Sequence, residues 1–538
     1  MKNKVLILLF AIGGLMTSCS DAYDIQQKGE INDPYEAFRN AQDVARGLNT
    51  IYSSIPGETE IEFASTFTDE VAIGLENGGQ GIIGGEFGFN MEANNSYAAS
   101  LWGSYYTMIN RINRLEEISK KLMAETTVSA EINSHRNNLG ELYALRAFAH
   151  YKLFAYFTPD YKNTSGLSAI ILDHVPPYDY SYSLPRNTVA EVKQFILDDL
   201  ERSEEIRQAG WSGINYVNAG MIESIRVKLY AMTEDWDKVL EHGQLVLNQY
   251  QLSTASQYSQ LFARVNPSEF IEPSSEIIFK LKRTLSTGGS VVASWYSVRA
   301  RGEDGSAFYE MGRSLYNELD KLDSSKTGEA FGTRADVRYN VNLLPDMDGY
   351  FGTKVLTTYE TASQSEYIID DLLFIGKYRG MVGANLKNDI PVFRVADILL
   401  AMAEARAGKG EILAPSTDPD DIVNKTTDVY SILYTIRFNR STDASTIEMP
   451  VITDPQSAYN AILTERRVEL AFEAARYLDM KRIGAKAGSE GFTRYSKDCV
   501  INGACNLPVS SNKLTLPIPI GEMTGNNSLT TDSQNPGY

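Results

Sequence analysis

The stretch "GELYALRAFAHYKLFAYF", Gly140 to Phe157, decides the fold class because its apolar residues recur at three- and four-residue steps. Its larger apolar side chains share one face of a helix together with an alanine: Leu142, Leu145, Ala149, Leu153 and Tyr156. Further alanines lie between them and leave room for a second helix to approach closely. We therefore expect a buried helix that packs against helical neighbours.

Helical periodicity also marks the segments around this stretch. It predicts a helix over 98–123 and a hairpin of two helices over 218–248, broken near "TEDWD". Thr188 and Glu191 have the spacing of a capping box and predict that another helix begins there. The N-terminal half therefore reads as a series of amphipathic helices.

The same pattern returns in the last third of the chain. Pro391 predicts the start of a helix that ends at Gly408, and an apolar stripe over 462–484 predicts another that ends at Gly484. Between the two helical regions, Gly, Ser, Asp and aromatic residues alternate without a sustained period. Long loops of this kind often carry function.

A short apolar leader begins the chain. Lys2 and Lys4 precede "VLILLFAIGGL", Val5 to Leu15, whose eleven residues reach about half of the roughly 20 needed to span a bilayer. This favours a cleaved secretory signal over a transmembrane anchor. Cys19 stands at the expected cleavage point and resembles a lipobox cysteine, which would carry a lipid. The alternative is an ordinary signal peptide with an accidental cysteine.

Together these patterns predict a mainly α fold with a large irregular, loop-rich region. Helix pairs with alanine-lined contacts suggest a tetratricopeptide-like array, but the repeat period is not clean, so spacing alone does not assign a solenoid. The predicted organisation is a signal peptide (1–18), a lipidated tether (19–33), an N-terminal helical region (34–250), a loop-rich insertion (251–390), and C-terminal helices with a loop-rich tail (391–538).

The chain is acidic, with a formal net charge of −19. Nucleic acid is therefore an unfavourable partner, because binding of phosphates needs a basic surface. The same charge disfavours a polyanionic ligand, although a local pair such as Arg299 and Arg301 could override it.

Cys499 and Cys505 are the only cysteines besides Cys19. Outside the cytoplasm a disulfide persists, and a loop this short closes at modest entropic cost. The sequence therefore favours a disulfide between them over two free thiols.

The sequence contains few motifs that would indicate catalysis, metal binding or cofactor binding. The four histidines lack metal-ligand spacing, and neither a nucleophile elbow nor a phosphate loop occurs. "GQGIIG", Gly79 to Gly84, matches a dinucleotide fingerprint but is followed by loop-forming residues, so a tight surface turn is the better interpretation. We expect no catalysis, cofactor or metal. Adjacent acidic residues leave a surface glycosidase or peptidase as a minor alternative.

Two segments combine aromatic rings with amides and arginines, as a sugar site requires. They span 77–95 and 286–309. The candidate ligand-binding residues are Asn77, Phe87, Phe89, Asn94, Trp295, Tyr296, Arg299 and Tyr309. The alternative for any one of these rings is a plug in the core beneath a long loop.

Several stretches, in order, resemble the SusD/RagB family of nutrient-binding outer-membrane lipoproteins. Besides the leader, they are "FTDEV" (67–71), "LWGSYYTMINRINRL" (101–115), "ELYALRAFAHYKLFAYF" (141–157), "FRVADILLAMAEA" (393–405), "YSILYTIRFNR" (430–440), "TERRVELAFEAARYLDMKRIG" (464–484) and the terminal "LPIPIGEM…NPGY".

This resemblance implies a SusD-like α/α superhelix of helix pairs covered by loops, lipid-anchored at Cys19 on the outer face of the outer membrane. It further implies a SusC-like TonB-dependent transporter as partner, with oligosaccharides as cargo or, in some branches, peptides. Within the shared motifs, Glu465, Arg466, Arg467 and Glu469 have helical spacing with Arg476 and Asp479. Such charges predict an ion-pair network between packed helices rather than a ligand site. The segment 535–538 is expected to dock as a turn with an aromatic plug.

Overall fold

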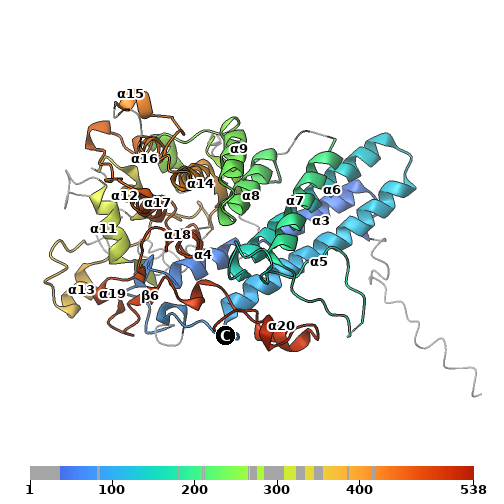
Figure 1. Cartoon of the computed structure of the whole chain (residues 1–538), viewed down its shortest axis with the longest axis horizontal. Helices are drawn as coiled ribbons and strands as arrows, with labels where there is room; N and C mark the ends of the chain where they lie inside the picture. The colour runs from blue at the N-terminus through green and yellow to red at the C-terminus, as the bar shows by residue number, and fades with distance from the viewer. Residues whose placement is uncertain are drawn as a thin grey trace, which may run out of the picture.

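Helices dominate the computed structural model. It describes residues 37–80, 85–179, 181–208, 210, 213–263, 266, 275–283, 308–322, 334–344, 355–384, 387–413, 416 and 418–538. Figure 1 shows long N-terminal helices on one side of the molecule, and shorter helices and loops, largely from the later part of the chain, on the other. The mainly α, loop-rich fold predicted from the sequence is confirmed.

The N-terminal helices pack in succession, α5 on α6, α6 on α7 and α8 on α9. They are α3 (Ala41–Ser53), α4 (Gly57–Thr66), α5 (Ser96–Glu125), α6 (Ser129–Phe157), α7 (Val189–Ile206), α8 (Ala219–Met232) and α9 (Trp236–Leu247). The predicted hairpin over 218–248 is confirmed, as is the capping box of Thr188 and Glu191. The helix predicted from Gly140 begins eleven residues earlier, at Ser129.

The remaining helices are mostly shorter. They are α10 (Ala255–Leu261), α11 (Arg313–Lys321), α12 (Val337–Asn342), α13 (Gln364–Asp370), α14 (Val395–Gly408), α15 (Pro419–Ile422), α16 (Val429–Phe438), α17 (Pro455–Glu469), α18 (Arg476–Ile483), α19 (Ser496–Cys499) and α20 (Ile520–Gly525). Helix α14 contacts α8 and α9 on one side and α16 and α17 on the other. It therefore joins the two helical regions into one core.

Within the described residues, strands form three antiparallel pairs. β1 (Val71–Ile73) pairs with β3 (Tyr309–Met311), β2 (Ile277–Leu281) with β4 (Ile390–Arg394), and β5 (Gly491–Thr493) with β6 (Asn506–Pro508). The first two pairs connect segments far apart in the chain, with Val71 opposite Met311 and Lys280 opposite Pro391.

Two predicted helix boundaries are wrong. Pro391 lies in strand β4, and helix α14 begins only at Val395. Proline fits the edge of a strand as well as the first turn of a helix, and pairing with β2 decides between them. The expected helix over 462–484 is interrupted after Glu469, where Phe472 and Ala474 have left-handed backbone angles of φ 61° and 62°. The N–H of Phe472 donates to Glu70 at 3.1 Å, so a tertiary contact offsets part of the cost of this break.

One large hydrophobic core extends from α3 to the tail. The apolar face of residues 140–157 lies at the centre of this core, with Leu142, Leu145, Ala149, Leu153 and Tyr156 fully buried. The segment 535–538 docks as expected, because Asn535 is buried and its amide donates to the carbonyls of Phe157 (2.9 Å) and Leu516 (2.6 Å). In the part of the chain described, no helix is long and apolar enough to cross a membrane.

Candidate ligand-binding face

Four segments from three distant parts of the sequence meet at one edge of the molecule. We call this surface the loop face and define it by residues 74–80, 85–95, 355–371 and 495–505. Pairing of β1 with β3 fixes its first segment, and the N–H of Gly74 adds a bond to the carbonyl of Phe308 at 3.0 Å. Figure 1 shows α13, α19 and β6 grouped at this edge.

The predicted aromatic platforms of the loop face lie inside the protein. Phe87, Phe89 and Tyr309 are only 1%, 4% and 4% exposed, so these rings match the alternative interpretation, plugs in the core beneath a long loop. The guanidinium of Arg494 lies 3.9 Å from the centre of the Phe87 ring and 4.0 Å from that of Phe89. The rings are therefore core plugs held by a cation.

Arg494 fastens the aromatic plugs to the backbone around them. It donates to the carbonyls of Thr66 (3.0 Å), Thr68 (2.9 Å) and Ala504 (3.1 Å), and also to that of Phe87. Burial lowers its pKa to about 9, because none of these contacts supplies a negative charge at short range. Its role is to hold two segments of the loop face, 85–95 and 495–505, against the end of helix α4.

The other predicted site residues have different positions. Asn77 is buried, donates to the carbonyl of Phe308 at 3.2 Å and leaves its side-chain oxygen unpaired, while Asn94 is exposed. Trp295, Tyr296 and Arg299 lie outside the described residues. The bond from Asn77 to Phe308 thus joins the two predicted segments, while most of the second segment lies outside the part described.

The half-buried aromatic rings of the loop face are two tyrosines that the sequence analysis did not identify. Tyr359 and Tyr495 meet edge to face, with ring centres 5.3 Å apart. The guanidinium of Arg313 lies 3.6 Å from the centre of the Tyr359 ring, and Asn317 donates to its hydroxyl at 3.1 Å. We call Tyr359 and Tyr495 the tyrosine corner. Their sequence surroundings, "TTYET" and "TRYSK", give no periodic signal.

Contacts from α19 hold the tyrosine corner in place. The ammonium of Lys497 donates to the carbonyls of Tyr359, Glu360 and Ala362, and Tyr367 of α13 donates to Asp498. Cys499 and Cys505 form a disulfide with their Cα atoms 5.2 Å apart. These contacts make one unit of the segments 355–371 and 495–505.

Buried carboxyl groups lie beneath the loop face. Burial raises the pKa of Glu310 to about 8, although it accepts from the N–H groups of Leu75 (2.9 Å) and Leu373 (3.3 Å). Burial also raises the pKa values of Asp371 and Asp498 to about 6, although Arg313 contacts both. Among the described residues no cluster of His, Cys, Asp and Glu could hold a metal ion.

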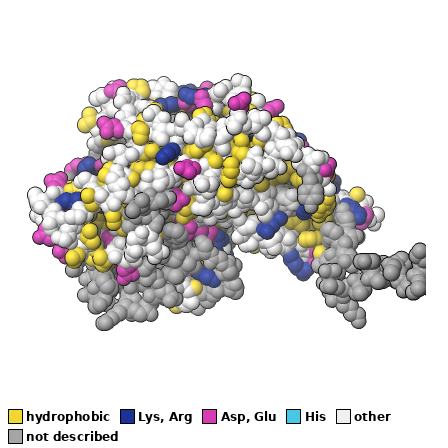
Figure 2. All heavy atoms as spheres, turned by 90° about the horizontal axis from the view of Figure 1, so that it is seen from below, with side chains coloured by type: hydrophobic (Ala, Val, Ile, Leu, Met, Phe, Trp, Pro, Cys, Tyr) yellow, Lys and Arg dark blue, Asp and Glu magenta, His cyan; other side chains and the backbone are white. Residues whose placement is uncertain are grey.

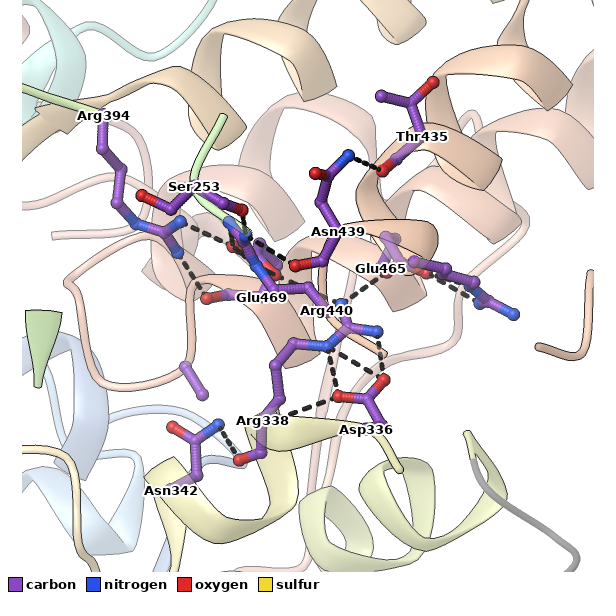
Figure 3. A network of polar contacts seen from close by, with 12 residues as sticks. Ser253, Asp336, Arg338, Asn342, Arg394, Thr435, Asn439, Arg440, Glu465 and Glu469 are labelled. Atoms are coloured by element: carbon purple, nitrogen blue, oxygen red, sulfur yellow. Dashed lines mark hydrogen bonds and ion pairs between the residues drawn. The ribbon is translucent and has the colours of Figure 1, made fainter. Parts of the chain in front are cut away.

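A separate set of charges lies deep in the fold. Figure 3 shows Arg338 of α12, Arg394 of β4 and Arg440 after α16 converging on Glu469 of α17. Their nitrogens lie 3.2, 2.6 and 2.9 Å from its carboxylate oxygens. Glu465 pairs with Arg338 at 2.6 Å in the same network. The predicted ion-pair network between packed helices is confirmed.

The other charges of the shared motifs are used in the same way. Arg466 contacts Asp397 (2.7 Å) and Asp479 (2.8 Å), while Arg476 contacts Asp69 at 2.8 Å. All five side chains are nearly or fully buried except for a small exposed part of Asp397. These residues therefore belong to the frame of the fold and not to the loop face.

Charges of both signs are spread over the outer surface. On the face seen in Figure 2, basic and acidic side chains are intermingled, with hydrophobic ones scattered between them. The net charge of −19 is thus not gathered into a single acidic field on the visible atoms of this face. A charged ligand on this face would therefore respond to the side chains next to it more than to the net charge of the protein.

Two family models match the chain. The one described as "SusD family" matches residues 375–538, and the one described as "Starch-binding associating with outer membrane" matches residues 41–214. Between them they include parts of the loop face from both the N-terminal and the C-terminal halves.

Curated relatives and solved structures agree with these matches. SusD-like proteins P2 and P38 of Formosa agariphila are 24% and 22% identical, over 100% and 89% of this chain and 99% and 91% of theirs. A SusD superfamily protein from Bacteroides thetaiotaomicron superposes with a TM-score of 0.67 at 19% identity, covering 92% of this chain and 100% of that one. A SusD-like carbohydrate binding protein from Bacteroides vulgatus gives 0.63 at 16% identity, covering 92% and 98%.

Proposed function

Because this chain belongs to the SusD-like family, we propose that it is a non-catalytic capture protein that binds oligosaccharides at the loop face. The observation that carries the proposal is the tyrosine corner, a pair of half-buried rings on a surface assembled from three distant parts of the sequence. The match to a family described as starch-binding supports a carbohydrate as the ligand.

The tyrosine corner has the chemistry that a sugar requires. Sugar rings present C–H faces that stack on aromatic rings, and their hydroxyl groups need hydrogen-bond partners at the rim. The hydroxyl of Tyr359, the exposed carboxylate of Glu360 and the amide of Asn502 lie on the same two segments as the rings. Because Lys497 and the disulfide hold these segments, little conformational entropy is lost on binding.

Location and partner follow from the leader and the family. We propose that lipid on Cys19 anchors the protein to the outer face of the outer membrane, where it delivers cargo to a SusC-like TonB-dependent transporter. The family description "associating with outer membrane" supports this location. The leader residues lie outside the described part of the chain.

Calorimetry on the chain from Ser20 onward tests the proposed site, with panels of neutral glycans, acidic glycans and short peptides. We expect binding of a glycan that weakens about tenfold in Tyr495→Ala, because about 1.4 kcal/mol of stacking is lost. Tyr495→Phe keeps the ring and should keep the affinity. Tyr178→Ala is the matched control, because Tyr178 is 97% exposed on a different loop, between α6 and α7.

The same experiment distinguishes the alternatives. Heat from peptides alone would replace the glycan proposal with the peptide-capture role, and unchanged glycan affinity in Tyr495→Ala would remove the tyrosine corner from the site. Release of shorter products from a bound glycan, followed by chromatography, would contradict the non-catalytic role.

A further inference from the structure

The two cations that contact Phe89 of the loop face, Arg494 and Lys513, are directed inward. Arg494 donates to backbone carbonyls and lies between two buried rings, as described above. Lys513, which follows the disulfide loop in the chain, donates to the carbonyl of Phe89 at 2.8 Å. Neither cation faces the solvent in front of the loop face, so neither is placed to meet an anionic ligand.

The two cations beside the tyrosine corner are used in the same way. Lys497 contacts three carbonyls of the segment 359–362, and Arg313 is buried, pairing with Asp371 at 2.6 Å beneath the Tyr359 ring. An anionic group at the tyrosine corner would have to take Lys497 away from the carbonyls that fix this segment.

The carboxylates of the loop face have the opposite orientation. Four glutamates are exposed there: Glu76, Glu92, Glu360 and Glu366. Within the described residues none of them forms an ion pair, although Glu366 accepts from the N–H of Ser363 at 2.7 Å as a helix cap. The surface that a ligand meets in this part of the chain is therefore negatively charged.

From this asymmetry we infer that the loop face selects neutral oligosaccharides and rejects polyanionic ones such as uronates and sulfated glycans. The inference rests on the proposed function and names its substrate class. Neutral sugars offer hydroxyl donors to the four carboxylates, whereas anionic sugars are repelled by them, and none of the described residues supplies a free cation at the tyrosine corner to compensate. Arg299 and Arg301, which could supply such a cation, lie outside the described residues.

The test compares matched pairs of glycans that share a backbone and differ in charge. Suitable pairs are methyl-esterified and free oligogalacturonate, and hydroxyethyl- and carboxymethyl-cellulose, with the neutral glycan that binds in calorimetry and its sulfated form added. For each backbone that binds, we expect the neutral member to bind at least about tenfold more tightly at low salt. Because exposed charges are screened over about 10 Å at 0.1 M salt, the ratio should shrink between about 0.02 M and about 0.5 M.

A charge-matched pair of variants assigns the effect to the loop face. Glu92→Gln with Glu360→Gln should reduce the neutral-to-anionic ratio about threefold, since two of the four exposed carboxylates are removed. Glu201→Gln with Glu205→Gln changes the net charge equally on α7, far along the chain from these segments, and should leave the ratio unchanged.

The outcomes separate the two claims. If the anionic member of a pair binds as tightly as the neutral member or more tightly, the inference is overturned, while glycan capture remains intact. If the neutral-to-anionic affinity ratio changes equally in both double variants, selection is due to the net charge of the protein, and the inference is also overturned. No binding of any glycan overturns the proposed function and this inference with it.

Discussion

Glutamates in two regions of this protein have opposite pKa shifts. Burial opposes the ionisation of Glu469, but the guanidinium groups of Arg440, Arg394 and Arg338 hold its pKa well below the usual range. Glu310, beneath the loop face, is also buried, but it accepts only from backbone N–H groups, and burial raises its pKa to about 8. At neutral pH the same side chain is therefore ionised in one region and mainly protonated in the other.

This difference shows how the two regions are held together. In the deep network, carboxylates and guanidiniums satisfy one another across α12, β4 and α17. At the loop face, Arg494 and Lys497 are used on backbone carbonyls, so they fix the course of loops. The first arrangement maintains the frame, and the second shapes the surface that we propose for binding.

Removing one charge from the deep network should have the largest effect. Glu469→Gln keeps the volume but leaves three buried guanidiniums without their common anion. Breaking a buried pair by removing one partner costs about 3–5 kcal/mol. Denaturant unfolding, followed by circular dichroism, should therefore show a free energy of unfolding lower by about that amount.

An exposed pair provides the control for this variant. Glu241 pairs with Lys238 on the surface of α9 at 2.7 Å, with both side chains about half exposed. Glu241→Gln should leave the unfolding midpoint unchanged. An equal loss in both variants would show that the network gains nothing from its burial and convergence.

Opening the disulfide should have an intermediate and more local effect. Cys499→Ser with Cys505→Ser removes a bridge between residues six apart, and closing so short a loop is worth about 2 kcal/mol on the chain-entropy model. Hydrogen exchange should rise in 495–505 and 355–371 and stay unchanged in α17. Faster exchange throughout the molecule would contradict the separation of the two regions.

The opposite pKa shifts predict a stability maximum in mild acid. Glu310 binds its proton more tightly in the folded state, so its contribution is full below the unfolded pKa of about 4.3 and is lost as the pH rises through about 8. Glu469 contributes above its unfolded pKa, and its contribution is lost only as the pH falls below it. Unfolding free energy should fall by about 1 kcal/mol or more between pH 5 and 8.

Substitution of Glu310 identifies the source of that slope. Glu310→Gln should reduce the slope between pH 5 and 8 without removing it, because burial also raises the pKa values of Glu62 and Glu70 to about 7. The loss of stability in stronger acid should remain in place. A variant with the same slope as the parent protein would show that Glu310 does not contribute to it, leaving Glu62, Glu70, Asp371 and Asp498, whose pKa values are also raised by burial, as the titrating groups.

Local patterns predicted the helices but not the loop face. The Thr188 cap and the apolar face of 140–157 depend on residues a few positions apart, so the sequence contains the whole signal. The break at Phe472 depends on Glu70, about four hundred residues away, and no periodicity reports such a contact. The burial of Phe87 and Phe89 beside Arg494 likewise depends on a contact about four hundred residues away in sequence, which no local pattern reports. Tyr495 is half-buried at the loop face, and the residues next to it in sequence give no signal for this position.

The pairing of Asp69 with Arg476 has a consequence for how the protein is made. The two residues are separated by 407 positions, and bacterial synthesis at about 5–20 residues per second needs roughly 20–80 s to cover that distance. Throughout this interval the early helices lack the tail that fastens them, with Asp69 still unpaired. A nascent chain of this kind stays open for a long time, during which a holding chaperone would limit its aggregation.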